Sequence, residues 1–277
     1  MIDGTPEEVV AVTAAFAIPF AFLLGAIIGS FLNVVIWRVP NGMSIVRPPS
    51  ACPECGHAIR GYDNIPILSW FILRGRCRDC GAPISPRYPI IEAVTSLAFA
   101  GIAALAVVGG VPWPLVPALL WFAGISIALT MIDLDVHRLP NAIVLPSYPV
   151  LVALLALASW LTGDWWALLH AAIGGAAMLL LYVVIVLVAP RGMGLGDVKL
   201  AGVIGLVLGW IGWGTLIVGG FGAFLLGGLF GVVLLLFRRA GRRTAIPFGP
   251  WMLLAAWLAI PLGQGVAEGY LRLVGLV

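Results

Sequence analysis

Residues 166–189 read WALLHAAIGGAAMLLLYVVIVLVA and contain no aspartate, glutamate, lysine or arginine. A helix needs about 20 consecutive apolar residues to cross the hydrocarbon core of a bilayer, so this stretch predicts a transmembrane helix. Comparable apolar runs lie at 9–37, 93–110, 115–133, 143–161, 166–189, 199–212, 215–237 and 248–263. These runs predict eight spans, and six or seven spans are the alternative because the run at 199–212 is short.

The composition agrees with a membrane protein. Of the 277 residues, 62% are hydrophobic and 10% are charged, whereas an ordinary soluble domain carries about 25% charged residues. This excludes a water-soluble domain of ordinary type. We expect an all-α polytopic helix bundle in the lipid bilayer, with a first transmembrane helix at 1–37, a cytoplasmic loop domain at 38–92 and a helical membrane domain at 93–277.

The lysines and arginines predict the orientation, since cytoplasmic loops carry an excess of them. If the N-terminus lies outside, the segments 38–92, 134–142, 190–199 and 238–247 face the cytoplasm. These four segments hold every basic residue except Arg272. The first run is too long, and its leading segment too acidic, for a cleavable signal peptide, so we expect it to remain in the protein.

All four cysteines lie in the predicted cytoplasmic loop, as Cys52-Pro-Glu-Cys55-Gly and Cys77-Arg-Asp-Cys80-Gly. The glycine after each pair permits a positive-φ turn that directs backbone N–H groups at the sulfurs. Four thiolates in two such turns can close a tetrahedral Zn²⁺ site, and a reducing cytosol disfavours disulfides. We predict a structural zinc site that folds the loop; four unliganded thiols and a redox pair are the alternatives.

Two aspartates stand at the ends of predicted membrane helices, where ionisable groups are costly and are therefore candidates for function. Asp133 ends the third run in the sequence MIDLD, and Asp197 opens the sixth in the sequence GLGD at 194–197. Two carboxylates brought together share one proton, because like charges at close range cannot both ionise. One can then act as the base on a water while the other protonates a substrate carbonyl. This is the chemistry of an aspartyl protease.

The surroundings of Asp197 leave other interpretations open. Gly194 and Gly196 leave room for a substrate backbone beside it. An aspartate at a helix N-terminus is, however, commonly a cap, and a salt bridge to Lys199 is equally compatible with the sequence. Proton-coupled transport also uses intramembrane acids, but a transporter typically shows internal repeats, and the sequence has none.

Six motifs in order resemble those of the bacterial type IV prepilin peptidases, over about residues 20–250. They are GAIIGSFLNVVIWRVP at 25–40, the two cysteine pairs, RYP at 87–89 leading to Glu92, the Asp133 motif, GLGD at 194–197 and PFGP at 247–250. One departure is Asn141, which stands where many relatives carry aspartate.

The resemblance implies an aspartyl endopeptidase of the bacterial cytoplasmic (inner) membrane. Its substrates would be prepilins and pseudopilins, which lose short basic leaders at the cytoplasmic face. By match of motif, Asp133 and Asp197 are the catalytic pair. The supporting motif comprises Gly194, Gly196 and Lys199. Asp135 ranks second, because a helix turns a residue two positions on to another face.

Relatives with the cysteine loop also methylate the new N-terminal amine, using S-adenosylmethionine. No G-x-G-x-x-G after a strand places the methyl-donor site in this sequence, and Tyr88 and Glu92 are the candidates for it. The alternatives are a peptidase without methyltransferase activity and a proton-coupled transporter. We expect no nucleic-acid partner.

Overall fold

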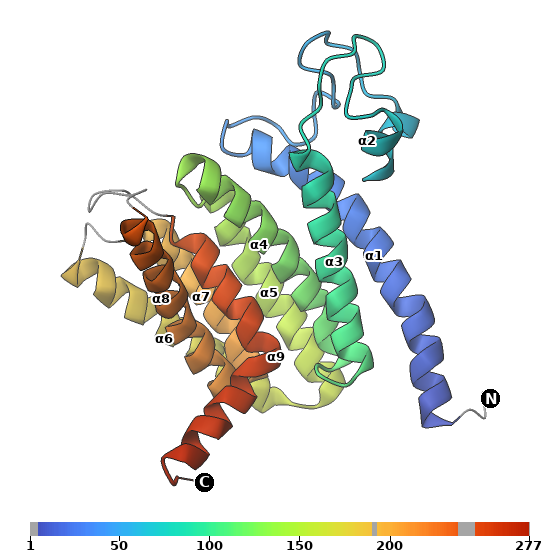
Figure 1. The fold of residues 1–277 in the computed structure, drawn as a ribbon. Helices are drawn as coiled ribbons and strands as arrows, with labels where there is room; N and C mark the ends of the chain where they lie inside the picture. Colours follow the sequence, from blue (N-terminus) through green and yellow to red (C-terminus); the bar gives the residue numbers. More distant parts are fainter. Residues whose placement is uncertain (1–4, 190–192, 238–246, 277) are drawn as a thin grey trace. The chain divides into compact units, whose positions relative to one another are not determined.

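A computed structural model of the protein describes residues 5–189, 193–237 and 247–276 (Figure 1). The helices are α1 (Pro6–Arg38), α2 (Leu68–Ile72), α3 (Arg87–Val107), α4 (Val116–Val136), α5 (Asn141–Thr162), α6 (Trp165–Val188), α7 (Leu195–Ile211), α8 (Trp213–Leu236) and α9 (Gly249–Leu273), with 3-10 turns η1 (Gly61–Asp63) and η2 (Trp113–Leu115). The described residues form no strand beyond two isolated bridge pairs, so the all-α prediction is confirmed. The basic residues Arg191, Arg238, Arg239, Arg242 and Arg243 lie outside the described residues.

Each of the eight apolar runs corresponds to one long helix. Seven of the helices in the described part of the chain are long and apolar enough to cross a membrane, namely α1, α3, α4, α5, α6, α8 and α9. The eighth, α7, has 17 residues and extends over about 26 Å at 1.5 Å per residue. Eight spans were predicted, with six or seven as the alternative. The helix that falls short of the length of a span is the one at the short run 199–212.

Two helix boundaries differ from the apolar runs. Helix α3 begins at Arg87, six residues before the run at 93–110, so Glu92 belongs to the helix. Helix α9 continues to Leu273, ten residues beyond the run that ends at 263. Both extensions contain polar residues, which hydropathy does not register as part of a span.

The chain divides into two compact units, and the first comprises Met1–Val116 with Leu120–Ala128. Its membrane part comprises α1 and α3, which pack along each other, and the segment Leu120–Ala128 of α4. Gly25 and Gly29 make this approach possible. A Cβ on Gly25 would lie 2.6 Å from the Cα of Ser96, and one on Gly29 would lie 2.7 Å from the Cα of Glu92. Small residues four apart thus allow the close helix contact that their spacing predicts.

The second unit comprises Pro117–Leu119 with Leu129–Val277, and α7 is its central helix. Helix α7 packs against α5, α6, α8 and α9, and every residue from Leu200 to Trp210 is buried. Its contact with α6 is built on glycines: a Cβ on Gly174 would lie 2.8 Å from the carbonyl oxygen of Gly205. The outward residues of α6 and α8 are large, apolar and exposed, as expected where the surrounding solvent is lipid.

Candidate active site and metal centre

The loop before α3 holds the cysteines in two turns of the same construction. In each turn the N–H of the following glycine donates to the carbonyl of the first cysteine, at 2.9 Å for Gly56 and 3.0 Å for Gly81. Both glycines have positive φ, 69° and 73°, which residues with a side chain rarely adopt. The glycine-dependent turns predicted from the sequence are therefore present.

The two turns bring the four sulfurs of Cys52, Cys55, Cys77 and Cys80 together. All lie within 4.8 Å of one another, and Sγ of Cys52 is 3.8 Å from Sγ of Cys80. Two sulfurs about 2.3 Å from one tetrahedral centre are separated by roughly 3.8 Å, so the set fits a metal ion. The pKa values of the thiols shift in opposite directions. The backbone N–H groups of Cys55 and Glu54 lower the pKa of the Cys52 thiol to about 7, which favours the thiolate there. Against the N–H of Ala82, burial and the neighbouring thiols raise the pKa of Cys80 to about 12.

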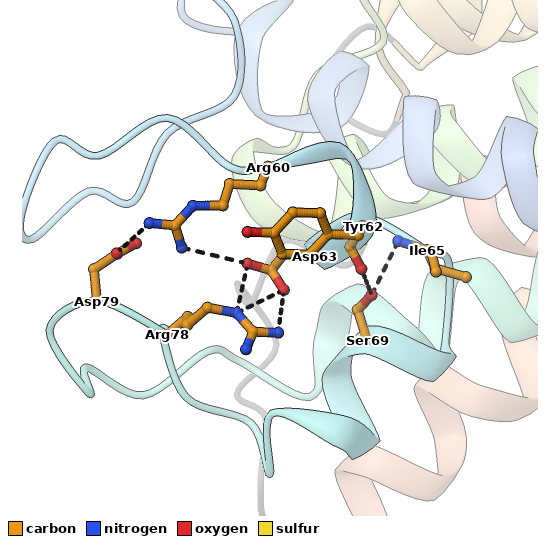
Figure 2. Close-up of polar contacts among 7 residues, drawn as sticks. All are labelled: Arg60, Tyr62, Asp63, Ile65, Ser69, Arg78 and Asp79. Atoms are coloured by element: carbon orange, nitrogen blue, oxygen red, sulfur yellow. Dashed lines mark hydrogen bonds and ion pairs between the residues drawn. The ribbon is translucent and has the colours of Figure 1, made fainter.

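Figure 2 shows an ionic clamp, made of Arg60, Asp63, Arg78 and Asp79, that ties the second turn to the chain after the first turn. Arg60 donates to Oδ1 of Asp79 at 2.7 Å. Arg78 donates to Asp63 through Nε, 2.9 Å from both carboxylate oxygens, and through Nη2, 2.6 Å from Oδ1. These hydrogen bonds from Arg78 hold the pKa of Asp63 below its usual range. Because Arg78 and Asp79 are the two residues inside the second cysteine pair, the clamp aligns the turns by contacts other than metal bonds.

Glu92, a candidate for methyl-donor binding, is buried in α3, and its carboxylate hydrogen-bonds to the loop that precedes this helix. Its Oε2 accepts the N–H of Ile67 at 2.7 Å, and the hydroxyl of Ser30 also hydrogen-bonds to it. Ile67 stands at φ 65° and ψ −56°, a strained γ-turn conformation for a β-branched residue. The carboxylate of Glu92 therefore stabilises a strained turn, a role for which the sequence contains no signal.

Tyr88, the second such candidate, lies in the first turn of α3. Its carbonyl accepts a hydrogen bond from Nδ2 of Asn33 at 3.2 Å, whereas its side chain is exposed. The ring is thus accessible to a ligand, and the backbone is held by α1.

Asp133 lies in the last turn of α4 and is 5% exposed. Its Oδ2 is buried and has no hydrogen-bond partner among the described residues. Asp135, two positions on, is exposed to the surroundings of the helix. The two aspartates therefore occupy different faces, as their spacing predicts, and only Asp133 is placed in the protein interior.

Asp197 is the third residue of α7 and is 9% exposed. Its Oδ2 accepts the N–H of Gly194 at 3.0 Å, so one carboxylate oxygen caps the helix. Lys199 instead donates to Oδ1 of Asn141 at 2.9 Å, and no ion pair between Lys199 and Asp197 is found in the described part of the chain. Of the alternatives considered from the sequence, the cap is present and the salt bridge is not.

Leu139 lies between the motifs that carry the two aspartates, all within the second unit. A Cβ on Gly196 would lie 3.0 Å from the Cβ of Leu139. A Cβ on Gly249 would lie 3.3 Å from Cδ2 of Leu139 and 2.8 Å from Oδ2 of Asp133. The charge of Asp133 also acts on Asp197. The second unit therefore holds two buried carboxylates in one electrostatic environment, bordered by glycines.

Sequence reasoning missed Tyr182, a fully buried residue of α6 beside this site. Its hydroxyl has no hydrogen-bond partner among the described residues, and the charge of Asp197 acts on it. The ring packs against Phe224 and Phe248, with centroids 5.5 and 6.5 Å away. A lone tyrosine inside an apolar run carries no sequence signal for this position.

Comparison with known proteins agrees with this arrangement. Residues 23–106 match the family described as bacterial peptidase A24 N-terminal domain, and residues 119–236 match the type IV leader peptidase family. The prepilin leader peptidase/N-methyltransferase of Aeromonas hydrophila is 36% identical, over 90% of this chain and 92% of its own length. The chain belongs to the type IV leader peptidase family.

Other members support this placement in the type IV leader peptidase family. The protein of the same description from Stutzerimonas stutzeri is 34% identical over 98% of this chain and all of its own length. The one from Myxococcus xanthus is 43% identical over 81% of this chain and 65% of its own length. No solved structure matches the chain. The resemblance that the six motifs indicated is thereby confirmed.

Proposed function

We propose that this protein cleaves the leader peptides of prepilins or pseudopilins and methylates the N-terminal amine that cleavage exposes. The observation that most supports the peptidase is the burial of Asp133 and Asp197 in one unit and in one electrostatic environment. The relatives described as prepilin leader peptidase/N-methyltransferase support both activities. The test is incubation of the purified protein with a prepilin peptide and labelled methyl donor, followed by peptide mass and label uptake.

In the proposed mechanism, Asp133 and Asp197 share one proton between their carboxyl groups. The ionised group takes a proton from a water as the water attacks the scissile carbonyl, and the protonated group donates to the carbonyl oxygen. The cap from Gly194 fixes Oδ2 of Asp197, while Oδ2 of Asp133 has no protein hydrogen bond to give up among the described residues. The absence of side chains at Gly196 and Gly249 lets Leu139 and the carboxylate of Asp133 pack closely against the backbone there, which fixes the surroundings of the two carboxylates.

We place the protein in the bacterial cytoplasmic membrane, with its N-terminus outside and the active site at the cytoplasmic face. Asp133 at the end of α4 and Asp197 at the start of α7 then lie at the membrane face to which the arginine-rich loops belong. A basic leader protruding from a membrane-inserted substrate would be reached from this face.

We propose that the four cysteines hold one structural Zn²⁺, which would lock the two turns without leaving an open position for catalysis. Purified protein should contain about one zinc per chain. Cys52→Ser or Cys80→Ser should lose it, because the three thiolates that remain bind Zn²⁺ more weakly than four. Metal analysis by mass spectrometry of freshly reduced protein measures the content. Ser50→Ala, an exchange near the site but outside the ligand set, is the control and should retain zinc. Metal-free protein that keeps the same loop structure would contradict the assignment.

Methyl transfer, with S-adenosylmethionine supplying the methyl group, is proposed to depend on the first unit, where Tyr88 and Glu92 lie. Tyr88→Ala should lower methylation by about tenfold or more while cleavage remains within about threefold, because both aspartates belong to the other unit. Glu92→Gln should act through the loop, because it weakens the hydrogen bond to Ile67. Measurement of both products from one reaction separates the effects, and unchanged methylation in both variants would remove these two residues from the proposal.

A further inference from the structure

A cavity of about 380 Å³ lies in the first unit, where the last turns of α1 meet the loop after it. Ile27, Phe31 and Val34 of α1 form one wall. They follow the spacing i, i+4 and i+7, which places them on one helix face. Arg38, one turn further along α1, also lines the cavity, and loop residues including Val46 and Pro48 complete the lining. The volume lies in the range of small-molecule sites, about 300–1,000 Å³.

Arg38 is a buried cation without a counter-ion among the described residues. It is 9% exposed, and its guanidinium donates through Nη1 to the carbonyl of Ser44 at 3.0 Å and through Nη2 to the carbonyl of Pro48 at 2.7 Å. None of the ion pairs found in the described part of the chain involves Arg38. A guanidinium carries five N–H donors, and a buried charge is costly unless it is paired. The cavity thus offers the N–H groups of an unneutralised arginine to an anion.

The apolar wall indicates what kind of molecule carries the anion. From Ile27 to Arg38 the helix rises about 16 Å, at 1.5 Å per residue. Ile27 and Phe31 are exposed, and both belong to the apolar part of α1, which is long enough to span a membrane. A ligand that fills the cavity would therefore pair an anionic group at Arg38 with an apolar chain that extends toward the lipid.

We propose that this cavity binds one anionic phospholipid, with its phosphate on Arg38 and an acyl chain along Ile27, Phe31 and Val34. Charge complementarity supports this choice: no acidic residue is part of the cavity lining in the described part of the chain, and the neighbouring Arg47 is exposed. The carboxylate of Glu92 lies behind the lining, where it is engaged by the hydroxyl of Ser30 and the N–H of Ile67. S-adenosylmethionine fits less well. Its carboxylate could reach Arg38, but its sulfonium and ammonium groups would face no acidic partner in that lining. The site extends the proposed function by a lipid requirement and does not depend on either enzymatic activity.

The test uses the full-length protein, delipidated in a neutral detergent and titrated with phosphatidylglycerol or phosphatidylcholine, with bound lipid counted by native mass spectrometry. Wild-type protein should retain one phosphatidylglycerol in clear preference to phosphatidylcholine. Arg38→Gln should weaken phosphatidylglycerol binding by at least about tenfold, because the phosphate loses its buried partner. Arg47→Gln is the matched control: it removes an equal charge from the exposed loop and should change binding by less than about threefold.

A second variant is needed because Arg38 also donates to the carbonyls of Ser44 and Pro48. Loss of binding in Arg38→Gln alone would not distinguish a lost phosphate contact from a misfolded loop. Val34→Trp fills the cavity from α1 with both hydrogen bonds intact, and should also lose the lipid. Equal binding of the two lipids by wild type would overturn the proposal, as would unchanged phosphatidylglycerol binding in both variants. Displacement of phosphatidylglycerol by S-adenosylmethionine would overturn it too, and would assign the cavity to the methyl donor.

Discussion

Asp133→Asn and Asp197→Asn should each abolish leader cleavage, lowering its rate by roughly 10³-fold or more. Asparagine keeps the size of the side chain but can neither share the proton nor act as the base on water. Folding should survive both changes. In Asp197→Asn the new amide oxygen can still accept the N–H of Gly194. In Asp133→Asn it can likewise accept the backbone N–H of Gly249, which hydrogen-bonds to the carboxyl group of Asp133. Cleavage of a prepilin in membranes, read from its size on a gel, measures the effect.

Asp135→Asn is the matched control, since it makes the same chemical change two positions from Asp133 on an exposed face of α4. It should keep cleavage within about tenfold of the wild type. If Asp135→Asn lost cleavage and Asp133→Asn retained it, Asp135 and not Asp133 would be the catalytic partner of Asp197. If Asp197 served only as a cap, Asp197→Asn would cap nearly as well and would remain active.

Gly249→Ala should lower cleavage by about a hundredfold, the order of loss that a displacement of about 1 Å at a reacting group causes. The new Cβ would lie 2.8 Å from Oδ2 of Asp133 and 3.3 Å from Cδ2 of Leu139. The first distance is shorter than a stable carbon–oxygen contact, so the carboxylate must move. Because Gly249 begins α9 with ordinary helical geometry, alanine introduces no backbone strain that would unfold the helix.

The control for Gly249→Ala is Gly228→Ala in α8, where a Cβ would meet no described atom within 4 Å. It should be as active as the wild type and slightly more stable, since alanine favours a helix over glycine. Zinc content and binding of lipid should be unchanged in both variants, because these sites belong to the first unit. Full cleavage by Gly249→Ala would show that Asp133 tolerates displacement, and would argue against a catalytic role for it.

The architecture could largely be predicted from the sequence, because a bilayer imposes a length and an apolar composition on every span. The eight runs mark the eight long helices. The predicted helix ends are wrong where a helix continues through polar residues. The turn from Arg87 to Glu92 extends α3 although it begins and ends with a charged residue, since it packs on α1 at Gly29. Helix α7 is short for a span, and its burial among four other helices is a tertiary property that hydropathy does not report.

The clustering of the four cysteines was predictable because each pair and its glycine are local in sequence. Asp133 and Asp197 were also identifiable, as acids at the ends of apolar helices. Their common environment was not, because it depends on contacts of Leu139 with Gly196 and Gly249, which are 57 and 110 positions away. The motif PFGP at 247–250 was the available signal for Gly249, and it indicated no role for the residue.

The ionic clamp of the loop and the buried hydroxyl of Tyr182 were likewise beyond sequence reasoning. Arg78 reaches back 15 residues to Asp63, and such pairings depend on how the two turns fold together. Arginines there were assigned only to the orientation of the chain, whereas two of them also hold the loop.

The most direct test of the shared-proton mechanism is the cleavage rate of the double variant Asp133→Asn, Asp197→Asn beside the two single variants, all purified and matched for helix content. Groups that act as one unit are grossly non-additive. The account predicts that the double variant cleaves a prepilin peptide within about threefold of the slower single variant. A double variant in which the two losses multiply, or a single variant that processes the peptide at the wild-type rate, would contradict it.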